Sequence, residues 1–264
     1  MLKIENANVI FNAKTVNEKH ALKNFSLDMK KGDFVTVIGS NGAGKSTLMN
    51  AVSGSVMLSS GKIFLDGTDI TRFKEHKRAK FIGRLFQDPL RGTAPNMTIE
   101  ENLGLAFSRG KKRTLSIGIS RSDLSMFREK LEALGLGLED RMKTPVGLLS
   151  GGQRQAVTLL MATLQKPQLL LLDEHTAALD PATSAKVLAL SDKIIHENGL
   201  TALMVTHNMQ DAITYGNRLI MMDKGRIILD ISGEEKKHLT IEDLLHKFEE
   251  VSGSKFASDS VILG

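Results

Sequence analysis

A glycine-rich run lies between a β-branched apolar segment and a stretch that is compatible with a helix. It matches the pattern G-x-x-x-x-G-K-[ST] and consists of Gly39, Ser40, Asn41, Gly42, Ala43, Gly44, Lys45, Ser46 and Thr47. Glycines let the backbone turn inward, so that several N–H groups and a helix N-terminus face one anion. In this pattern Lys45 reaches the β- and γ-phosphates, and the Ser46 hydroxyl is a ligand for Mg²⁺. The run therefore predicts a nucleoside triphosphate site.

Two adjacent carboxylates, Asp173 and Glu174, follow the apolar run 169–172. A buried strand of this kind presents its last residues at the edge where open α/β sheets bind ligands. There Asp173 would hold Mg²⁺ through its water shell, and Glu174 would orient and polarise an attacking water as general base. On their own, the two residues could equally be a solvated strand end. Downstream of the glycine-rich run, they predict triphosphate hydrolysis.

The elements that must position these groups are visible as alternating strand and helix patterns. Expected strands are 2–9, 33–38, 62–67, 81–86, 169–172, 201–205, 218–222 and 226–230. Helices are expected from Lys45, from a capping box formed by Thr98 and Glu101, from Asp180 with Pro181 at N1, and over 209–215. The alternation predicts an α/β fold with a mostly parallel sheet and a β-rich N-terminal part. The helical stretch 89–164 interrupts it as an inserted lobe.

Bulk composition limits the classes of protein that remain. The 264 residues are 41% hydrophobic and 25% charged, which predicts one domain, over 1–250, with a tail from 251. No cysteine is present, which excludes disulfides and cysteine metal sites. No apolar run is long enough to cross a bilayer, so we expect a soluble chain whose membrane role would need a partner. The net charge of +5 does not by itself indicate nucleic-acid binding, and the basic run 109–113 lacks the interleaved aromatics that would stack on bases.

The run Leu149–Gln153 resembles the signature sequence of ABC ATPases. Its residues Ser150, Gly151, Gly152 and Gln153 lead into a helix predicted from Gln153 onward, which offers a second set of N–H groups and a hydroxyl to an anion. One chain has no need of two cradles for one γ-phosphate. The resemblance implies that this second cradle serves the ATP on an opposite subunit, in a homodimer with two shared ATP sites.

Four further positions fit the same family pattern. Gln87 resembles the glutamine that touches metal and water and senses the membrane partner, and Asp180 belongs to a segment like the one that crosses the dimer interface. His207, after the strand 201–205, is similar to the histidine that contacts the γ-phosphate. Phe11 is placed like the aromatic that stacks on adenine, although a core phenylalanine is an alternative. The resemblance covers residues 2–247 and implies the P-loop NTPase fold of ABC type.

The chain departs from the family pattern at four positions that do not contact nucleotide. His175 stands where proline is usual, and Asn208 where an acidic residue is common. Ala156 and Met161 replace arginines that often follow the signature. We expect these differences to affect packing of the lobe rather than ATP hydrolysis.

Three kinds of ABC protein are compatible with these motifs. A transporter subunit is favoured by the single ATPase domain and compact lobe, and it implies transmembrane permease subunits, a place on the cytoplasmic side of the membrane and an extracytoplasmic solute-binding protein. Segments 87–98 and 215–222 resemble bacterial importer ATPases whose binding proteins take aromatic amino acids. The alternatives are a soluble assembly factor, as in iron–sulfur cluster systems, and a DNA or translation ATPase. The latter usually carries a coiled coil, a zinc module or a second ATPase domain, and none is visible here, so no nucleic-acid partner is expected.

Overall fold

The computed structural model describes residues 1–110 and 118–252, and the chain folds as two compact units. The first unit combines Met1–Arg78 with the chain from Leu200 onward, and the second is Ala79–Gly199. The elements of the first unit are β1 (Leu2–Phe11), β2 (Lys19–Met29), β3 (Phe34–Gly39), α1 (Lys45–Ser53), β4 (Ser60–Leu65), β5 (Thr68–Asp69), α2 (Glu75–Arg78), β8 (Thr201–Val205), α7 (Met209–Thr214), β9 (Arg218–Asp223), β10 (Arg226–Ser232), α8 (Glu234–Lys237) and α9 (Ile241–Ser252). Those of the second are β6 (Ile82–Leu85), the 3₁₀ turn η1 (Pro89–Gly92), α3 (Ile99–Phe107), α4 (Arg121–Glu132), the 3₁₀ turn η2 (Val146–Leu148), α5 (Gly151–Thr163), β7 (Leu169–Asp173) and α6 (Pro181–Asn198).

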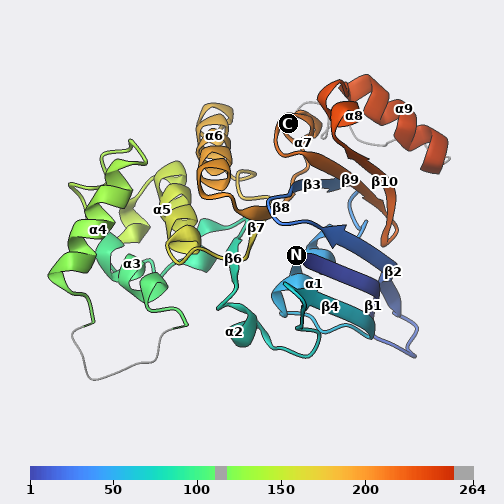
Figure 1. Ribbon diagram of the computed structural model, residues 1–264, viewed down its shortest axis with the longest axis horizontal. Helices are drawn as coiled ribbons and strands as arrows, with labels where there is room; N and C mark the ends of the chain where they lie inside the picture. Colours follow the sequence, from blue (N-terminus) through green and yellow to red (C-terminus); the bar gives the residue numbers. More distant parts are fainter. Residues whose placement is uncertain (111–117, 253–264) are drawn as a thin grey trace. The chain divides into compact units, whose positions relative to one another are not determined.

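Two sheets form the first unit (Figure 1). One is antiparallel, with strand order β2-β1-β4-β5, and the other runs β10-β9-β3-β8. In the second sheet β3 is parallel to both neighbours, and β10 adds an antiparallel edge. Residues 34–38 of β3 are all buried, as expected for a central parallel strand covered on both faces. This central strand delivers the glycine-rich run directly into α1.

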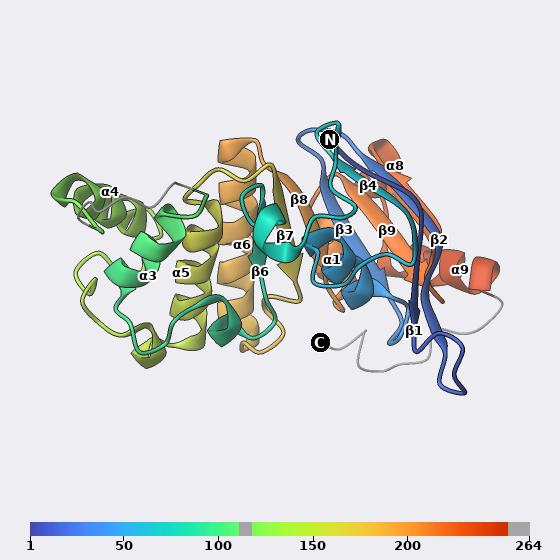
Figure 2. The same cartoon turned by 90° about the horizontal axis from the view of Figure 1, so that it is seen from below.

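The C-terminal helices cover the β9–β10 side of the second sheet, where Figures 1 and 2 show α9 beside the outer strands. Met221 of β9, Ile231 of β10 and Leu244 and Phe248 of α9 are buried in one hydrophobic cluster with Met209 and Ala212 of α7. Their removal from water is the main stabilising contribution of α9. Neither α9 nor β2 was singled out in the sequence.

The second unit packs helices beside the short parallel pair β6–β7 (Figure 2). Helix α5 contacts α3, α4 and α6, and its apolar face joins a cluster that includes Leu103, Phe127 and Leu131. The predicted capping box at the start of α3 is present: Thr98 Oγ1 accepts from the Glu101 N–H, and the Glu101 carboxylate accepts from the Thr98 N–H.

The predicted α/β class with a mostly parallel sheet is confirmed, and the differences lie at element ends. The first strand extends to Phe11 rather than Val9, and helix α5 begins at Gly151 instead of Gln153. The tail expected from 251 lies outside the described residues except for its first two, which end α9. Residues 111–113 of the basic run also lie outside them. Among the described residues no helix has the length and apolarity to span a membrane.

Candidate functional site

The glycine-rich loop adopts a backbone that side chains at two positions would prevent. Gly39 has φ of 149°, and a Cβ there would lie 2.1 Å from the Met222 carbonyl oxygen. Gly44, the residue before α1, has φ of 103°, and its Cβ would lie 2.6 Å from the Ala21 carbonyl oxygen. Both glycines are therefore required by close backbone contacts as well as by positive φ. The loop runs directly into the N-terminus of α1 at Lys45, as the predicted anion site requires.

Lys45 is 7% exposed and bonded to the loop itself. Its Nζ donates to the carbonyl oxygens of Gly39, at 2.6 Å, and Ser40, at 3.2 Å. The β9–β10 turn braces the loop through the Gly225 N–H, which donates to the Ala43 carbonyl. The ammonium group is thus held against the loop, and a bound phosphate would compete with the two carbonyl oxygens for it.

Strand β7 ends in the two carboxylates predicted from the sequence. The Asp173 carboxylate accepts from Arg84 of β6 at 2.7 Å, and this pair is mostly buried, with side chains 11% and 16% exposed. Glu174 has φ of 45°, a left-handed conformation that is unfavourable for a residue with a Cβ. Strain at a predicted general base is typical of a functional site, because surrounding contacts must hold it there.

His175, the departure that follows Glu174, is fully buried. Its Nε2 lies 3.1 Å from the Ser191 hydroxyl of α6. Burial lowers the pKa of His175 to about 4, so the ring is neutral at physiological pH. His175 was expected only to affect packing of the lobe. Its hydrogen bond instead ties the chain after the predicted base to α6.

The predicted second cradle lies at the start of α5. Ser150 is exposed and forms a capping box with Gln153, and the glycines that follow face α6 and the segment before it. A Cβ at Gly152 would lie 2.3 Å from Thr183 Cγ2, and one at Gly151 would lie 2.9 Å from Leu179 Cδ2. The run Ser-Gly-Gly-Gln thus lets α5 approach α6 closely while its N-terminal N–H groups stay near the surface.

Three other predicted residues lie at element junctions. Gln87 is exposed just after β6, and His207 is half-buried just before α7. Asp180 caps α6 by accepting from the Thr183 N–H at 3.0 Å, and the hydrogen bonds with Thr183 lower the pKa of this carboxyl. Burial raises the pKa of Asp211, and the nearby His207 opposes that shift.

Phe11 is the last residue of β1, paired with Lys19, and it is 38% exposed. The alternative that it is a core phenylalanine is therefore wrong. An exposed ring at a strand end is compatible with stacking on a flat ligand.

The predicted residues are divided between the units. The first unit contains Phe11, the glycine-rich loop and His207. The second unit contains Gln87, Ser150–Gln153, Asp173, Glu174 and Asp180. Sequence reasoning missed Arg84, the partner of Asp173, and Gln155 of α5, because neither belongs to a motif. Their roles appear only in the three-dimensional contacts.

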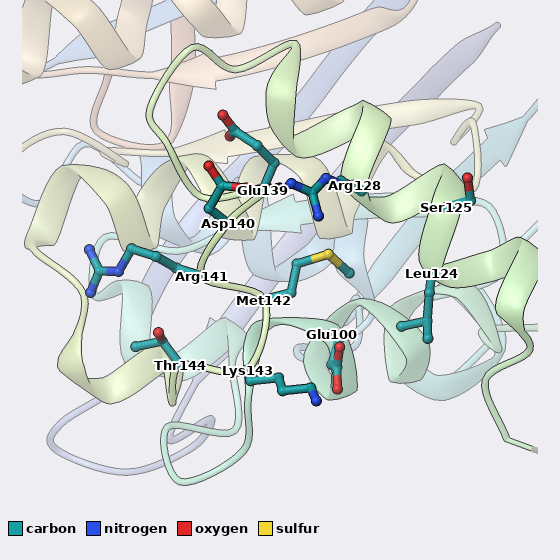
Figure 3. A pocket seen from close by; sticks show the side chains of 10 residues that line it. All are labelled: Glu100, Leu124, Ser125, Arg128, Glu139, Asp140, Arg141, Met142, Lys143 and Thr144. Atoms are coloured by element: carbon teal, nitrogen blue, oxygen red, sulfur yellow. Dashed lines mark hydrogen bonds and ion pairs between the residues drawn. The ribbon is translucent and has the colours of Figure 1, made fainter.

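A pocket in the helical part of the second unit contains none of the predicted residues (Figure 3). It is bordered by Leu124, Glu139, Met142 and Lys143 among others, and the ion pair of Arg128 with Asp140 lies at its rim. Because none of the predicted site residues borders it, this pocket is not assigned to the hydrolytic chemistry.

The comparisons place the chain in a family. The family model described as ABC transporter matches residues 22–177, more than half of the chain. The tyrosine transport ATP-binding protein of Clostridioides difficile (strain R20291) is 47% identical over 94% of this chain and 99% of its own length. The energy-coupling factor transporter ATP-binding protein EcfA2 of Clostridium perfringens (strain 13 / Type A) is 35% identical over 87% and 79%, respectively.

Solved structures agree with this family. A dimeric ATP-binding cassette bound to ADP and Pi in a post-hydrolysis state is similar with a TM-score of 0.75 and 28% identity, over 88% of this chain and 98% of that one. The chain therefore belongs to the ABC transporter family and has the ABC-type P-loop NTPase fold. Within that family it is an ATP-binding subunit, and it hydrolyses ATP.

Proposed function

We propose that the chain powers solute uptake through a bacterial ABC importer. The observation that carries this is the 47% identity, over nearly the whole of both chains, to a tyrosine transport ATP-binding protein. More distant relatives are named as import ATP-binding proteins for methionine, phosphonates and thiamine. The reading as an assembly factor or as a DNA or translation ATPase has no comparable support.

The cargo we propose is an aromatic amino acid, tyrosine in the first instance. The resemblance of segments 87–98 and 215–222 to importers of this group points the same way as the name of the 47% identical relative. Permease subunits would hold the chain at the cytoplasmic face of the membrane, and a solute-binding protein would deliver the cargo from the other side. Residues 1–250 would act as one ATPase domain.

Mg²⁺ is proposed as the metal that accompanies ATP. The candidate donors are the Ser46 hydroxyl, the Asp173 carboxylate and the Gln87 amide oxygen, which are the hard oxygen ligands that Mg²⁺ prefers. Asp173 is ionised and paired with the Arg84 guanidinium, which a metal ion would have to displace or share. A magnesium ion here would neutralise charge on the β- and γ-phosphates.

The chain's own residues then divide the work of hydrolysis. The loop N–H groups and Lys45 bind the phosphates, Phe11 stacks on the adenine, and Glu174 takes a proton from the attacking water. Ser150–Gln153 and Asp180 act across a homodimer, where the signature covers the γ-phosphate held by the partner, and His207 contacts that phosphate from its own chain. Hydrolysis followed by release of the cleaved phosphate would remove the γ-phosphate charge that joins the two halves, so the dimer would reopen.

Two substitutions test this chemistry. Glu174→Gln keeps the size of the side chain but cannot accept a proton, so turnover should fall by about 10²–10⁴-fold while Mg-ATP still binds. The variant should accumulate as an ATP-bound dimer in size-exclusion chromatography. Lys45→Ala should instead lose ATP affinity. Wild-type hydrolysis in Glu174→Gln would refute the assignment of the base.

Transport needs a separate experiment. Tagged chain purified from its native membrane should bring permease subunits and a solute-binding protein, which are then reconstituted in proteoliposomes with ATP on the side of the ATPase. ATP-dependent uptake of labelled tyrosine is the expected result, and Glu174→Gln in the same assembly is the control. Uptake of methionine but not of aromatic amino acids would refute the cargo while leaving the importer intact.

A further inference from the structure

Gln155 connects two catalytic segments of the second unit. Its side chain is fully buried on α5, just after the signature glycines. The Nε2 group donates to the Phe86 carbonyl at 3.3 Å and to the His175 carbonyl. Phe86 directly precedes Gln87, and His175 directly follows Glu174. One amide group therefore holds the main chain beside both residues that are proposed to act on the attacking water.

The orientation of this amide is determined by its neighbours. The two carbonyl oxygens both need a donor, and only the NH₂ group of the amide can donate twice. In the flipped orientation Oε1, which is an acceptor, would face two other acceptors. In the observed orientation Oε1 is buried and has no hydrogen-bond partner among the described residues. An unsatisfied buried oxygen destabilises a fold, so a native protein that retains one calls for an explanation. Here the paired NH₂ group supplies one.

Glu174 gives this contact a mechanical role. Its φ of 45° is strained, and such a conformation persists only where the surroundings hold it. The next residue is fixed at two points, since the His175 ring bonds to Ser191 of α6 and its carbonyl bonds to Gln155 of α5. Loss of the Gln155 amide would release one of these two points.

We propose that Gln155 is a positioning residue for ATP hydrolysis, which holds Gln87 and Glu174 in place through the carbonyl groups of Phe86 and His175. The proposal rests on the roles assigned to Gln87 and Glu174 above. Helix α5 would then both begin with the signature, at its N-cap Ser150, and hold the predicted base in position through Gln155 in its second turn.

The test replaces Gln155 with Met, which has a similar volume and no donor. The kcat for ATP should fall by about 10–100-fold, as expected for a small displacement of a catalytic group, while the Kd for ATP is unchanged. Gln165→Met is the matched control, because it removes an amide that donates to the Phe107 carbonyl in the same unit, away from Gln87 and Glu174. This control should keep the wild-type kcat. Melting temperatures of both variants show whether they are folded, and Gln155→Asn, too short to reach both carbonyls, replaces Gln155→Met if the latter is not.

A double variant separates positioning from a general loss of structure. Gln155→Met should lower the residual single-turnover rate of Glu174→Gln by a smaller factor than it lowers the rate of wild type, because only the effect through Gln87 remains. An undiminished kcat in Gln155→Met, or a full further loss in the double variant, would overturn the proposal. Neither result bears on the proposed function, which is tested separately by ATP hydrolysis in Glu174→Gln and by tyrosine uptake in proteoliposomes.

Discussion

At the scale of single residues, two cationic side chains at the predicted site are bonded to the chain itself: Lys45, which belongs to the glycine-rich motif, and Arg84, which belongs to no motif. Lys45 donates to carbonyl oxygens of its own loop, and Arg84 pairs with Asp173. Both interactions hold a charged group at the place where phosphate or metal is proposed to bind, and both must be exchanged when it does. Binding of ATP or metal would therefore replace hydrogen bonds that these groups make within the chain. The affinity for the ligand should then depend on residues outside the motifs, such as Arg84.

The Arg84–Asp173 pair provides a prediction about metal binding. Arg84→Met should lower the free energy of unfolding by about 3 kcal/mol, because Asp173 is left as a mostly buried, unpaired carboxylate. The Mg²⁺ concentration that gives half-maximal stabilisation by ATP should fall, since a guanidinium no longer competes for Asp173. Thermal melting with ATP and increasing Mg²⁺ measures both effects.

Arg128→Met is the control for this prediction. It breaks the pair with Asp140, whose side chains are 60% and 72% exposed, so stability should change by less than about 1 kcal/mol. Its Mg²⁺ response should match that of wild type. An unchanged Mg²⁺ response in Arg84→Met would show that Asp173 does not bind the metal.

Phe11 tests the adenine site. Phe11→Ala should weaken ATP binding by about 1–3 kcal/mol, the range measured for base–aromatic stacking. Inhibition by tripolyphosphate, which has no base, should not change. Val16→Ala, at a fully exposed apolar residue, should bind ATP like wild type. Isothermal titration gives these affinities. Equal losses for ATP and tripolyphosphate would place the effect in the phosphate loop instead.

At the scale of elements, capping residues predicted the starts of two helices. Thr98 with Glu101 and Asp180 with Pro181 mark the starts of α3 and α6 correctly. The same signal was available for α9, where Thr240 and Asp243 exchange hydrogen bonds, but it was missed. Element ends moved by up to two residues where pairing decided them, as in the extension of β1 to Phe11.

The site was predictable only as far as its residues belong to contiguous motifs. The conformation of Gly39 and Gly44 follows from the pattern itself, whereas the pair of Arg84 and Asp173 joins residues 89 positions apart. Likewise, the contacts of Gln155 become visible only when β6, β7 and α5 are packed together. Tertiary pairing of this kind leaves no period or spacing in a single sequence.

The junction of β7 with α6 predicts a dependence of stability on pH. The pKa of buried His175 is about 4, below its ordinary value of 6.5, so the unfolded chain binds the proton first as the pH falls. This contribution to stability is complete above pH 6.5 and is lost progressively between pH 6.5 and 4. The free energy of unfolding should fall by about 3 kcal/mol over this range because of His175. His175→Gln should abolish this pH-dependent fall.

Urea denaturation at several pH values checks this expectation. His175→Gln should show a flatter stability profile between pH 6.5 and 4 than wild type. His76→Gln, at an exposed histidine, should keep the wild-type slope. Parallel profiles for wild type and His175→Gln would mean that the ring is not held neutral in the folded chain.

At the scale of the whole molecule, two segments of the chain are proposed to bind a γ-phosphate: the loop before α1 and the start of α5. Similar cassettes have been solved as dimers, one of them bound to ADP and Pi. The exposed Ser150 is free to meet a second copy, while Gly151 and Gly152 face the chain's own residues Leu179 and Thr183. A head-to-tail dimer gives the second cradle a nucleotide of its own to cover.

Ser150→Arg tests this arrangement. The bulk and charge at position 150 should block closure over the partner's nucleotide, yet leave the chain's own phosphate loop unchanged. In the Glu174→Gln background, the variant should therefore bind ATP with about the same Kd but remain monomeric in size-exclusion chromatography. Ser120→Arg is the matched control, because Ser120 forms the equivalent capping box at the start of α4 and lies outside the signature. With Ser120→Arg the ATP-bound dimer should persist, so loss of a helix cap is excluded as the cause. A mixing experiment is done with chains that keep Glu174. Ser150→Arg mixed with Lys45→Ala should give heterodimers with one damaged and one intact composite site, and thereby recover part of the hydrolysis. Normal ATP hydrolysis by Ser150→Arg alone would mean that the signature does not act on a partner's nucleotide.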